Sequence, residues 1–124
     1  MTRSPDDVVT EFCKKWASPD PAELAGYFTE DGVYHNIPME PVQGPDAIRE
    51  FIAGLTADFD GIDFQVHRQV SDGNTVMNER TDVMRRRDGG RLALPVMGVF
   101  EVVDGRIASW KDYFDLATVT NAFA

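Results

Sequence analysis

An arginine and a carboxylate stand two positions apart in the segment VMNERTDVM, residues 76–84. The segment reads as a β-strand, in which residues i and i+2 point to the same face of a sheet. Arg80 and Asp82 therefore share a face, and Met84 follows them on it. Such a pair lies either on the solvent-exposed face of a sheet or on the floor of a polar site.

A second carboxylate and two further polar groups occur in two other predicted strands. In IASWKDYFDL, Asp112 shares its face with Trp110 and Phe114. A solvated face is seldom built from a carboxylate between two large aromatic rings. In VYHNI, Tyr34 and Asn36 share one face. Three separate strands thus carry polar groups beside apolar neighbours.

Each of these groups, taken alone, has an ordinary structural explanation. The arginine–aspartate pair could be a surface ion pair worth about 0–1 kcal/mol. Asp112 could be a satisfied carboxylate near a turn, and Tyr34 and Asn36 could close a loop. Spacing alone favours these explanations, but five polar groups in a dry core would be costly unless they formed one connected network. We therefore predict that Arg80, Asp82, Asp112, Tyr34 and Asn36 form one connected polar network that faces inward.

The elements that position these groups are predicted from turn residues and apolar periodicity. Three helices are expected in the first half of the chain, beginning at Pro5, Pro21 and Pro45. A short strand should follow a turn at Asp31-Gly32 and end at Pro38. From residue 61 the apolar period changes to two, as in a strand. The later strands, joined by hairpin turns, are predicted at 62–70, 75–86, 91–103 and 106–116.

This order of elements predicts an α+β fold. The later strands form an antiparallel meander. A curled sheet, antiparallel or mixed, would wrap three N-terminal helices packed on its concave face and enclose a cone-shaped cavity. We expect a single domain of residues 1–124. Strand parity predicts that the apolar, substrate-binding wall of the cavity is formed by Met84, Leu94, Val96, Phe114 and Phe64. Both faces of strand 91–103 are apolar, which predicts that it is covered on both sides.

The bulk composition argues against several classes of partner and location. The net charge of −9 disfavours binding to nucleic acid or an anionic membrane. No apolar run reaches the ~20 residues needed to span a bilayer. The first residues lack the apolar region of a secretory signal. A single cysteine, Cys13, excludes an internal disulfide and favours a cytoplasmic location.

No metal or cofactor site is predicted. His35 and His67 are isolated from other ligand residues, and no phosphate-binding glycine loop or serine nucleophile motif occurs. Cys13 lies on the apolar stripe of the first helix, which indicates a buried thiol rather than a nucleophile.

The sequence resembles the limonene-1,2-epoxide hydrolase family. This family is a branch of the cone-shaped, SnoaL-like superfamily that includes nuclear transport factor 2 and ketosteroid isomerase. The matching segments are YHNIP, NERTDVM, LPVMGVFEV and WKDYFDL, in the same order and with similar separations. The resemblance implies a cofactor-independent hydrolase that opens an apolar, terpenoid-like or cyclic epoxide to a vicinal diol with water in one step. It also implies a homodimer.

The five catalytic residue types of that family match Asp82, Asp112, Arg80, Tyr34 and Asn36. On this resemblance, Asp112 takes a proton from a water held by Tyr34 and Asn36. Asp82, as the neutral acid, protonates the epoxide oxygen. Burial and the nearby Asp112 carboxylate should raise the pKa of Asp82, whereas Arg80 should lower it. The expected result is a pair that shares one proton and is held in place by Arg80.

Two other functions stay open for such a fold, because one fold hosts many functions. A ketosteroid isomerase-like or polyketide cyclase-like enzyme would use one carboxylate to deprotonate carbon, which leaves the Asp–Arg–Asp bridge without a task. A non-catalytic binding module would need only the apolar cavity, which leaves five converging polar groups unexplained.

Overall fold

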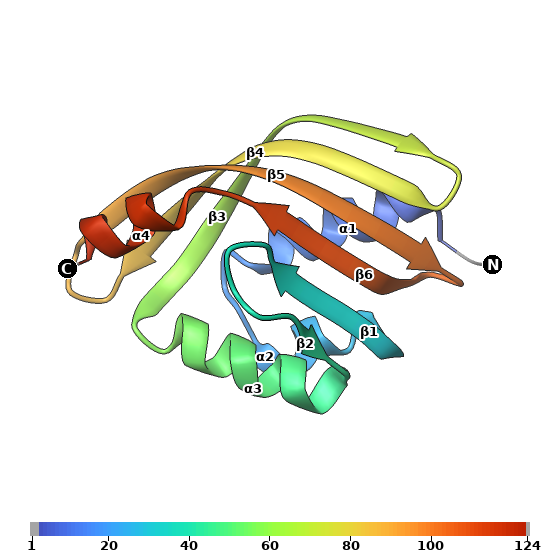
Figure 1. Cartoon of the computed structure of the whole chain (residues 1–124), viewed down its shortest axis with the longest axis horizontal. Helices are drawn as coiled ribbons and strands as arrows, with labels where there is room; N and C mark the ends of the chain where they lie inside the picture. The colour runs from blue at the N-terminus through green and yellow to red at the C-terminus, as the bar shows by residue number, and fades with distance from the viewer. Residues whose placement is uncertain (1–2, 124) are drawn as a thin grey trace.

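The computed structural model describes residues 3–123 and shows a curled, six-stranded sheet with helices along its open side (Figure 1). The helices of this part of the chain are α1 (Pro5–Lys15), α2 (Pro21–Ala25), α3 (Pro45–Thr56) and α4 (Leu116–Ala122). The strands are β1 (Phe28–Asn36), β2 (Val42–Gln43), β3 (Phe59–Asp72), β4 (Thr75–Arg86), β5 (Arg91–Val103) and β6 (Arg106–Tyr113).

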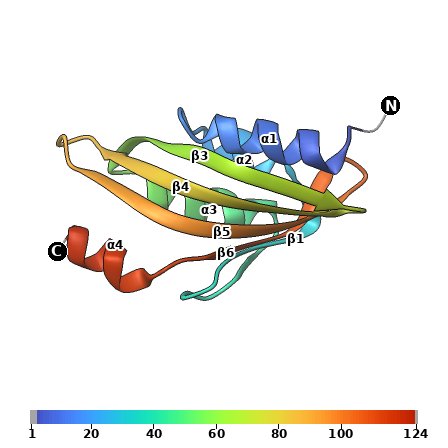
Figure 2. The same ribbon diagram turned by 90° about the horizontal axis from the view of Figure 1, so that it is seen from above.

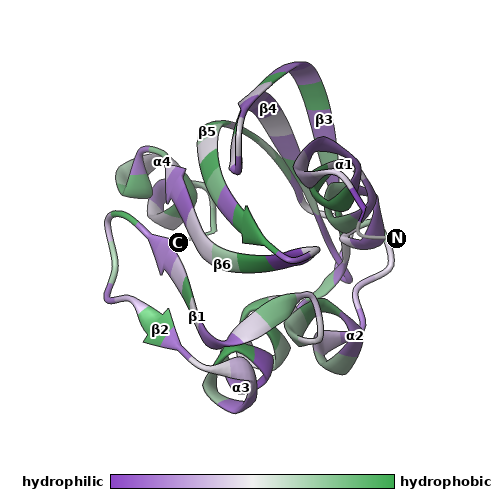
Figure 3. Ribbon diagram, turned by 90° about the vertical axis from the view of Figure 1, so that its right-hand side faces the viewer, coloured by the Kyte–Doolittle hydropathy of each residue, from purple (hydrophilic) through white to green (hydrophobic). Residues whose placement is uncertain are grey.

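The sheet order is β2-β1-β6-β5-β4-β3. Strands β3 to β6 form the predicted antiparallel meander. Strand β1 pairs in parallel with β6, so the sheet is mixed. Figure 3 shows how strongly the sheet curls, with α1, α2 and α3 along the side that the curl leaves open. The predicted α+β fold with a curled sheet around three N-terminal helices is confirmed.

The three predicted helices begin at their prolines. The Ser4 hydroxyl accepts a hydrogen bond from the Asp7 backbone N–H at 3.1 Å and caps α1. Asp20 caps α2 by accepting the N–H groups of Ala22 and Glu23. These caps satisfy N–H groups that have no partner within the helix. Seen from above, α1 and α2 lie along one side of β3 and β4 (Figure 2).

The apolar stripes of these helices meet the concave face of the sheet. Phe12 of α1 lies edge-on to Trp110 of β6, with ring centroids 5.0 Å apart. Trp16 stacks on Phe64 of β3 at 5.3 Å. Among residues 3–123, no helix is long and apolar enough to cross a membrane.

The hairpin turns have the conformation that their sequences predict. Asp104 and Gly105 both have positive φ, 50° and 79°, as a two-residue turn between twisted strands requires. Gly73 and Gly89, at 59° and 96°, occupy the same region in the other two turns.

Two local predictions are wrong. Asp31-Gly32 does not form a turn before a strand. It lies within β1, where the pairing with β6 shifts register between Phe28 and Val33. Gly32 permits this irregularity, because a Cβ there would lie 2.9 Å from the Cβ of Phe28. The dipeptide that predicted a turn therefore marks a bulge. Turns and bulges both favour glycine where the backbone comes close to another part of the chain.

The second difference is at the chain's C-terminal end. The strand predicted over 106–116 ends at Tyr113 and is followed by α4. Helix α4 has only seven residues and none of them is buried, so its apolar residues form too short a pattern for a helical period to be recognised. Its threonine and valine residues are also more typical of strands.

A further observation concerns the outer, convex face of β5. The described residues leave Met97 46% exposed on it, so the predicted cover of this face would have to come from another chain and stays a prediction. The opposite set, Leu94, Val96 and Phe100, is buried as predicted. Helices α1, α2 and α3 pack on the concave face of the sheet.

Candidate active site

Arg80 lies at the centre of a buried polar network on the concave face of the sheet. Its side chain is fully buried, and Phe64 covers the guanidinium at 4.4 Å from the ring centroid. Nε and Nη2 donate to the two oxygens of Asp82, each at 2.9 Å. Nη2 and Nη1 donate to the two oxygens of Asp112 at 2.8 and 3.2 Å. Nη1 also donates to Oδ1 of Asn78 at 3.0 Å. All five N–H donors of the guanidinium are therefore used.

The network crosses β5 at Gly98. Gly98 lies opposite Asn78 of β4 and Asp112 of β6 in the sheet register. A Cβ on Gly98 would lie 2.5 Å from Nη1 of Arg80 and 2.9 Å from the bonding oxygens of Asn78 and Asp112. The absence of a side chain at this position is what lets an arginine on one strand reach a carboxylate two strands away.

Replacing Gly98 with alanine should lower the free energy of unfolding by about 1–3 kcal/mol, because the added methyl overpacks a rigid buried network. Chemical denaturation monitored by circular dichroism measures this. Gly54→Ala is the matched control, since a Cβ at Gly54 of α3 meets no atom within 4 Å and alanine is the better helix former. An alanine at position 98 that is as stable as the control would contradict the assigned role of Gly98.

Asp112 has a further partner that strand parity did not reveal. The indole Nε1–H of Trp110 donates to Oδ1 of Asp112 at 2.7 Å. Trp110 is fully buried, and its ring stacks on Tyr34 at 4.2 Å with an interplanar angle of 4°. The sequence placed both residues on one face but gave Trp110 only an apolar role. The signal was an indole donor two positions from a carboxylate on the same strand face.

The electrostatic environment separates the two aspartates. Burial raises the pKa of Asp82; the Arg80 guanidinium lowers it, and the Asp112 carboxylate raises it again, for a net shift upward. Within residues 3–123, Asp112 accepts three hydrogen bonds and Asp82 accepts two. Hydrogen bonds to a carboxylate favour its charged form. The raised pKa of Asp82 makes it a candidate to carry a proton in this site.

Tyr34 and Asn36 come from β1, and its parallel pairing with β6 brings them to the carboxylates. In that register Tyr34 lies opposite Trp110 and Asn36 opposite Asp112. Both side chains are buried. Burial, and then the nearby Asp112 carboxylate, raises the pKa of the Tyr34 phenol well above its usual range. Its hydroxyl therefore stays neutral and can both donate and accept a hydrogen bond.

These groups face a cavity of about 180 Å³. Tyr34, Asn36, Asp82 and Asp112 line it, whereas Arg80 lies behind the carboxylates and does not. The five apolar residues predicted from strand parity all line it: Met84, Leu94, Val96, Phe114 and Phe64. Strand parity was not used to find six further lining residues, namely Trp16, Met39, Leu55, Ile62, Leu116 and Val119. Ile62 lies within β3 with the parity of Phe64 and could have been found. The others lie in helices or loops, where alternation along a strand gives no orientation.

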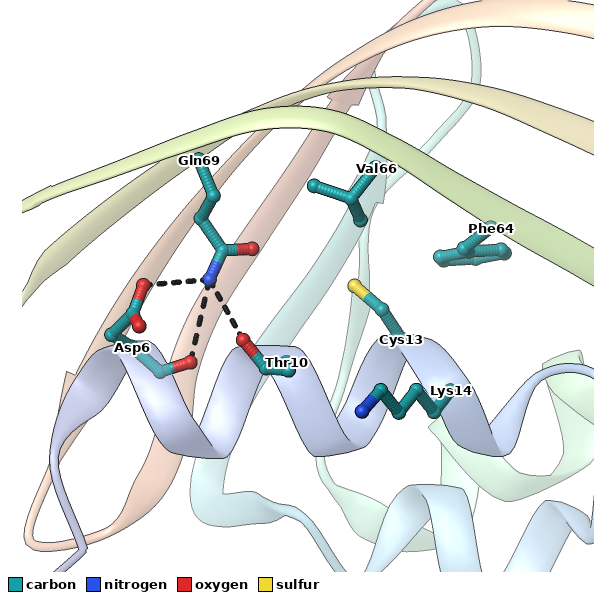
Figure 4. A pocket seen from close by; sticks show the side chains of 7 residues that line it. All are labelled: Asp6, Thr10, Cys13, Lys14, Phe64, Val66 and Gln69. Atoms are coloured by element: carbon teal, nitrogen blue, oxygen red, sulfur yellow. Dashed lines mark hydrogen bonds between the residues drawn. The ribbon is translucent and has the colours of Figure 1, made fainter.

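A larger hollow, of about 410 Å³, lies between α1 and β3 (Figure 4). Its lining includes Asp6, Thr10 and Gln69 but neither aspartate of the pair. It is therefore a surface groove beside the network rather than the reaction cavity. Within residues 3–123, no group of three or more histidine, cysteine or acidic side chains is arranged to hold a metal ion.

The chain is similar in sequence to known proteins. The SnoaL-like domain family matches residues 9–110. Epoxide hydrolase EphG of Mycobacterium tuberculosis (strain ATCC 25618 / H37Rv) is 36% identical over 87 residues, which cover 70% of this chain. The match spans 57% of that relative's length.

Solved structures share the whole fold. A Mycobacterium tuberculosis LEH-like epoxide hydrolase superposes with a TM-score of 0.83 at 29% identity, covering 98% of this chain and 90% of the other. A SnoaL-like polyketide cyclase from Shewanella denitrificans, described as putative in its structure, has a TM-score of 0.84 at 16% identity, with 96% of each chain covered. The second likeness shows the fold alone. The chain belongs to the SnoaL-like family, and its predicted likeness to the limonene-1,2-epoxide hydrolase family is confirmed by the two epoxide hydrolases among these relatives.

Proposed function

We propose that this protein is a cofactor-independent epoxide hydrolase that opens its substrate by one-step attack of water. The observation that carries the proposal is the Arg80-bridged aspartate pair, with both carboxyl groups at the wall of an apolar cavity. Opening an epoxide needs a base for the attacking water and an acid for the leaving oxygen, and general acid–base groups supply both.

The proposed step conserves protons within the pair. Tyr34 and Asn36 hold the water, and Asp112 accepts its proton as the water oxygen bonds to carbon. The carbon–oxygen bond of the ring breaks, and Asp82 gives its proton to the ring oxygen. The vicinal diol leaves while the pair still holds one proton, now on Asp112. Transfer of that proton back to Asp82 restores the starting state.

The charge of the network supports this assignment. One guanidinium between two ionised carboxylates leaves one excess negative charge, and a single shared proton removes it. Two carboxylates that contact one Nη2 group titrate as a pair rather than independently. The isomerase or cyclase alternative uses only one carboxylate and gives this bridge no task.

The cavity supports a small, uncharged, apolar substrate. Its volume of about 180 Å³ is below the roughly 300–1,000 Å³ of sites for drug-sized ligands. Its lining has no lysine, arginine or histidine to hold a phosphate or carboxylate group. A compact cyclic or terpenoid-like epoxide meets both conditions.

Single turnover of cyclohexene oxide in ¹⁸O-labelled water tests the reaction. Direct attack by water should place ¹⁸O in the diol of the first turnover, as measured by mass spectrometry. We expect attack by water because Tyr34 and Asn36 would have no role if the Asp112 carboxylate itself attacked the carbon. Unlabelled diol in the first turnover would show an ester intermediate and overturn the one-step mechanism. Absence of turnover on a panel of cyclic and linear apolar epoxides would overturn the hydrolase assignment.

We also propose that the chain forms a homodimer through the convex face of β4, β5 and β6. Met77, Met97 and Tyr113 are 43, 46 and 47% exposed there, and Met97 pairs with Tyr113 in the register. A neighbouring copy would cover this apolar face. A monomeric molar mass in solution at micromolar concentration would contradict this. A cytoplasmic location, suggested by the free buried Cys13, stays a prediction.

A further inference from the structure

A chain of polar side chains connects the guanidinium of Arg80 to helix α1. Oδ1 of Asn78 accepts from Arg80, and Nδ2 of Asn78 donates to Oε1 of Gln69 at 3.1 Å. Nε2 of Gln69 in turn donates to Oδ1 of Asp6 at 2.7 Å and to Oγ1 of Thr10 at 3.0 Å. Figure 4 shows this outer end, where the Gln69 amide reaches from β3 down to α1.

The direction of every hydrogen bond in this chain is determined by its two ends. A guanidinium can only donate and an ionised carboxylate can only accept. Each amide between them must therefore present its oxygen toward Arg80 and its nitrogen toward Asp6. If either amide were reversed, two donors or two acceptors would face each other. Asn78 and Gln69 thus have one satisfied orientation.

Asn78 occupies a place where a carboxylate would have bonded equally well to Arg80. Its side chain is buried, with the residue 1% exposed, and it lies two positions before Arg80 on the same strand face. An aspartate there would add a third negative charge around one guanidinium. A neutral amide accepts from the fifth donor of Arg80 without adding a charge. One proton on the aspartate pair is then enough to make the group of Arg80, Asp82 and Asp112 neutral.

We propose that Asn78 is a positioning residue that holds the Arg80 guanidinium with a neutral acceptor and so sets the charge of the aspartate pair, while Gln69 and Asp6 anchor Asn78 to α1. The inference rests on the proposed function for its catalytic consequence but not for its electrostatic one. Sequence reasoning did not single out Asn78, although it shares the face of Arg80 and Asp82.

The other groups around the pair do not supply a competing charge. Tyr34 faces it from β1 as a neutral phenol. Cys13 faces it from α1, and Nδ2 of Asn78 donates to its sulfur at 3.7 Å. Burial raises the pKa of the Cys13 thiol to about 12, so it too is uncharged at neutral pH. Arg80, Asp82 and Asp112 are therefore the charged groups at the pair itself, and Asp6 is a carboxylate at the outer end of the chain, separated from them by Gln69 and Asn78.

Asn78→Asp tests the electrostatic part. The carboxyl carbons of Asp82 and Asp112 can be followed by ¹³C NMR over pH, which needs no substrate. We expect the titration midpoint of the pair to rise by about one pH unit or more, because a like charge disfavours ionisation. With cyclohexene oxide as the probe, the alkaline limb of the kcat profile should move in the same direction.

Glu79→Gln is the matched control. It also changes one charge on β4, but on the opposite face, where the Glu79 side chain is 47% exposed and pairs with Arg68. Solvent screens a charge at such a site, so the midpoint should stay where it is in the wild type. An Asn78→Asp midpoint that matches the control would overturn the inference.

Gln69→Leu tests the anchoring part at a half-buried position, and it decides the matter if Asn78→Asp does not fold. Loss of the Gln69 acceptor removes the anchor of Asn78 to α1 and leaves the weakly accepting Cys13 sulfur as the described partner of its Nδ2. We expect kcat for cyclohexene oxide to fall about tenfold with little change in KM, because the apolar cavity is untouched. An unchanged kcat together with an unchanged NMR midpoint would overturn the inference.

The two readouts separate this inference from the proposed function. If the wild type turns over no epoxide but the Asn78→Asp midpoint rises, the positioning role stands and only the hydrolase assignment fails. If the wild type hydrolyses epoxides but neither variant changes midpoint or kcat, the hydrolase assignment stands and this inference fails.

Discussion

Asp112→Asn should lower kcat/KM for cyclohexene oxide by about 10²–10⁴-fold, the usual contribution of a general base. The amide is nearly the size of the carboxylate but cannot take a proton from water. The side chain also loses one acceptor, so one of its contacts with Arg80 or Trp110 must weaken. Steady-state kinetics measured with the folded variant give the result. Circular dichroism and thermal unfolding show whether the fold persists, as we expect.

Asp82→Asn should lower kcat/KM by about the same factor. Here the general acid is lost instead of the base, so the ring oxygen no longer receives a proton. The residual rate of this variant should also behave differently with pH. Wild-type turnover should fall as pH rises through the raised pKa of Asp82, because the proton donor is then lost. The residual turnover of Asp82→Asn should not fall over that pH range, because this variant has no carboxylic acid at position 82 to lose its proton.

Asp63→Asn is the matched control for both aspartates. Asp63 also pairs with an arginine, Arg85, at 3.0 Å, but its side chain is 40% exposed and does not line the reaction cavity. Its replacement should leave turnover near that of the wild type. If Asp82→Asn or Asp112→Asn also kept near wild-type turnover, the acid–base roles would be wrong.

The parts of the site that were predictable are those governed by strand alternation. Arg80 and Asp82 could be placed on one face because every second residue of a strand points the same way. The same rule put Tyr34 with Asn36, and Asp112 with Trp110, on shared faces. These shared faces depend only on local geometry, which a single sequence contains, whereas the approach of one face to the other depends on the parallel pairing of β1 with β6.

What the sequence did not reveal depends on contacts between segments. The donor role of Trp110 requires its ring to be oriented by stacking on Tyr34 from another strand. The need for Gly98 appears only when β4 and β6 flank β5 in register. Helix α4 has only seven residues and buries none of them, so its period is too short to recognise, and Leu116 could not be assigned. Met39 lies in the loop after β1, where alternation along a strand gives no orientation.

Arg80→Lys should also reduce kcat/KM, by about 10²-fold or more, although it keeps the positive charge. The five hydrogen bonds of Arg80 go to three side chains and use a planar fork whose donors point outward in fixed directions. A lysine ammonium offers three donors from one point and cannot bridge both carboxylates and Asn78 at once.

The stability of Arg80→Lys should fall as well. Lysine keeps the charge but cannot supply all five donors, so buried acceptors of Asp82, Asp112 and Asn78 are left unsatisfied, and each unsatisfied buried group costs about 1–3 kcal/mol. Arg85→Lys is the matched control, since Arg85 bonds to Asp63 and to the Ala17 carbonyl at a partly exposed edge. That pair should contribute no more than about 1 kcal/mol. Urea unfolding and turnover, measured on both variants, make the comparison. If Arg80→Lys kept more than half of the wild-type turnover, a point charge would suffice between the aspartates, and the bridging role of the guanidinium would be wrong.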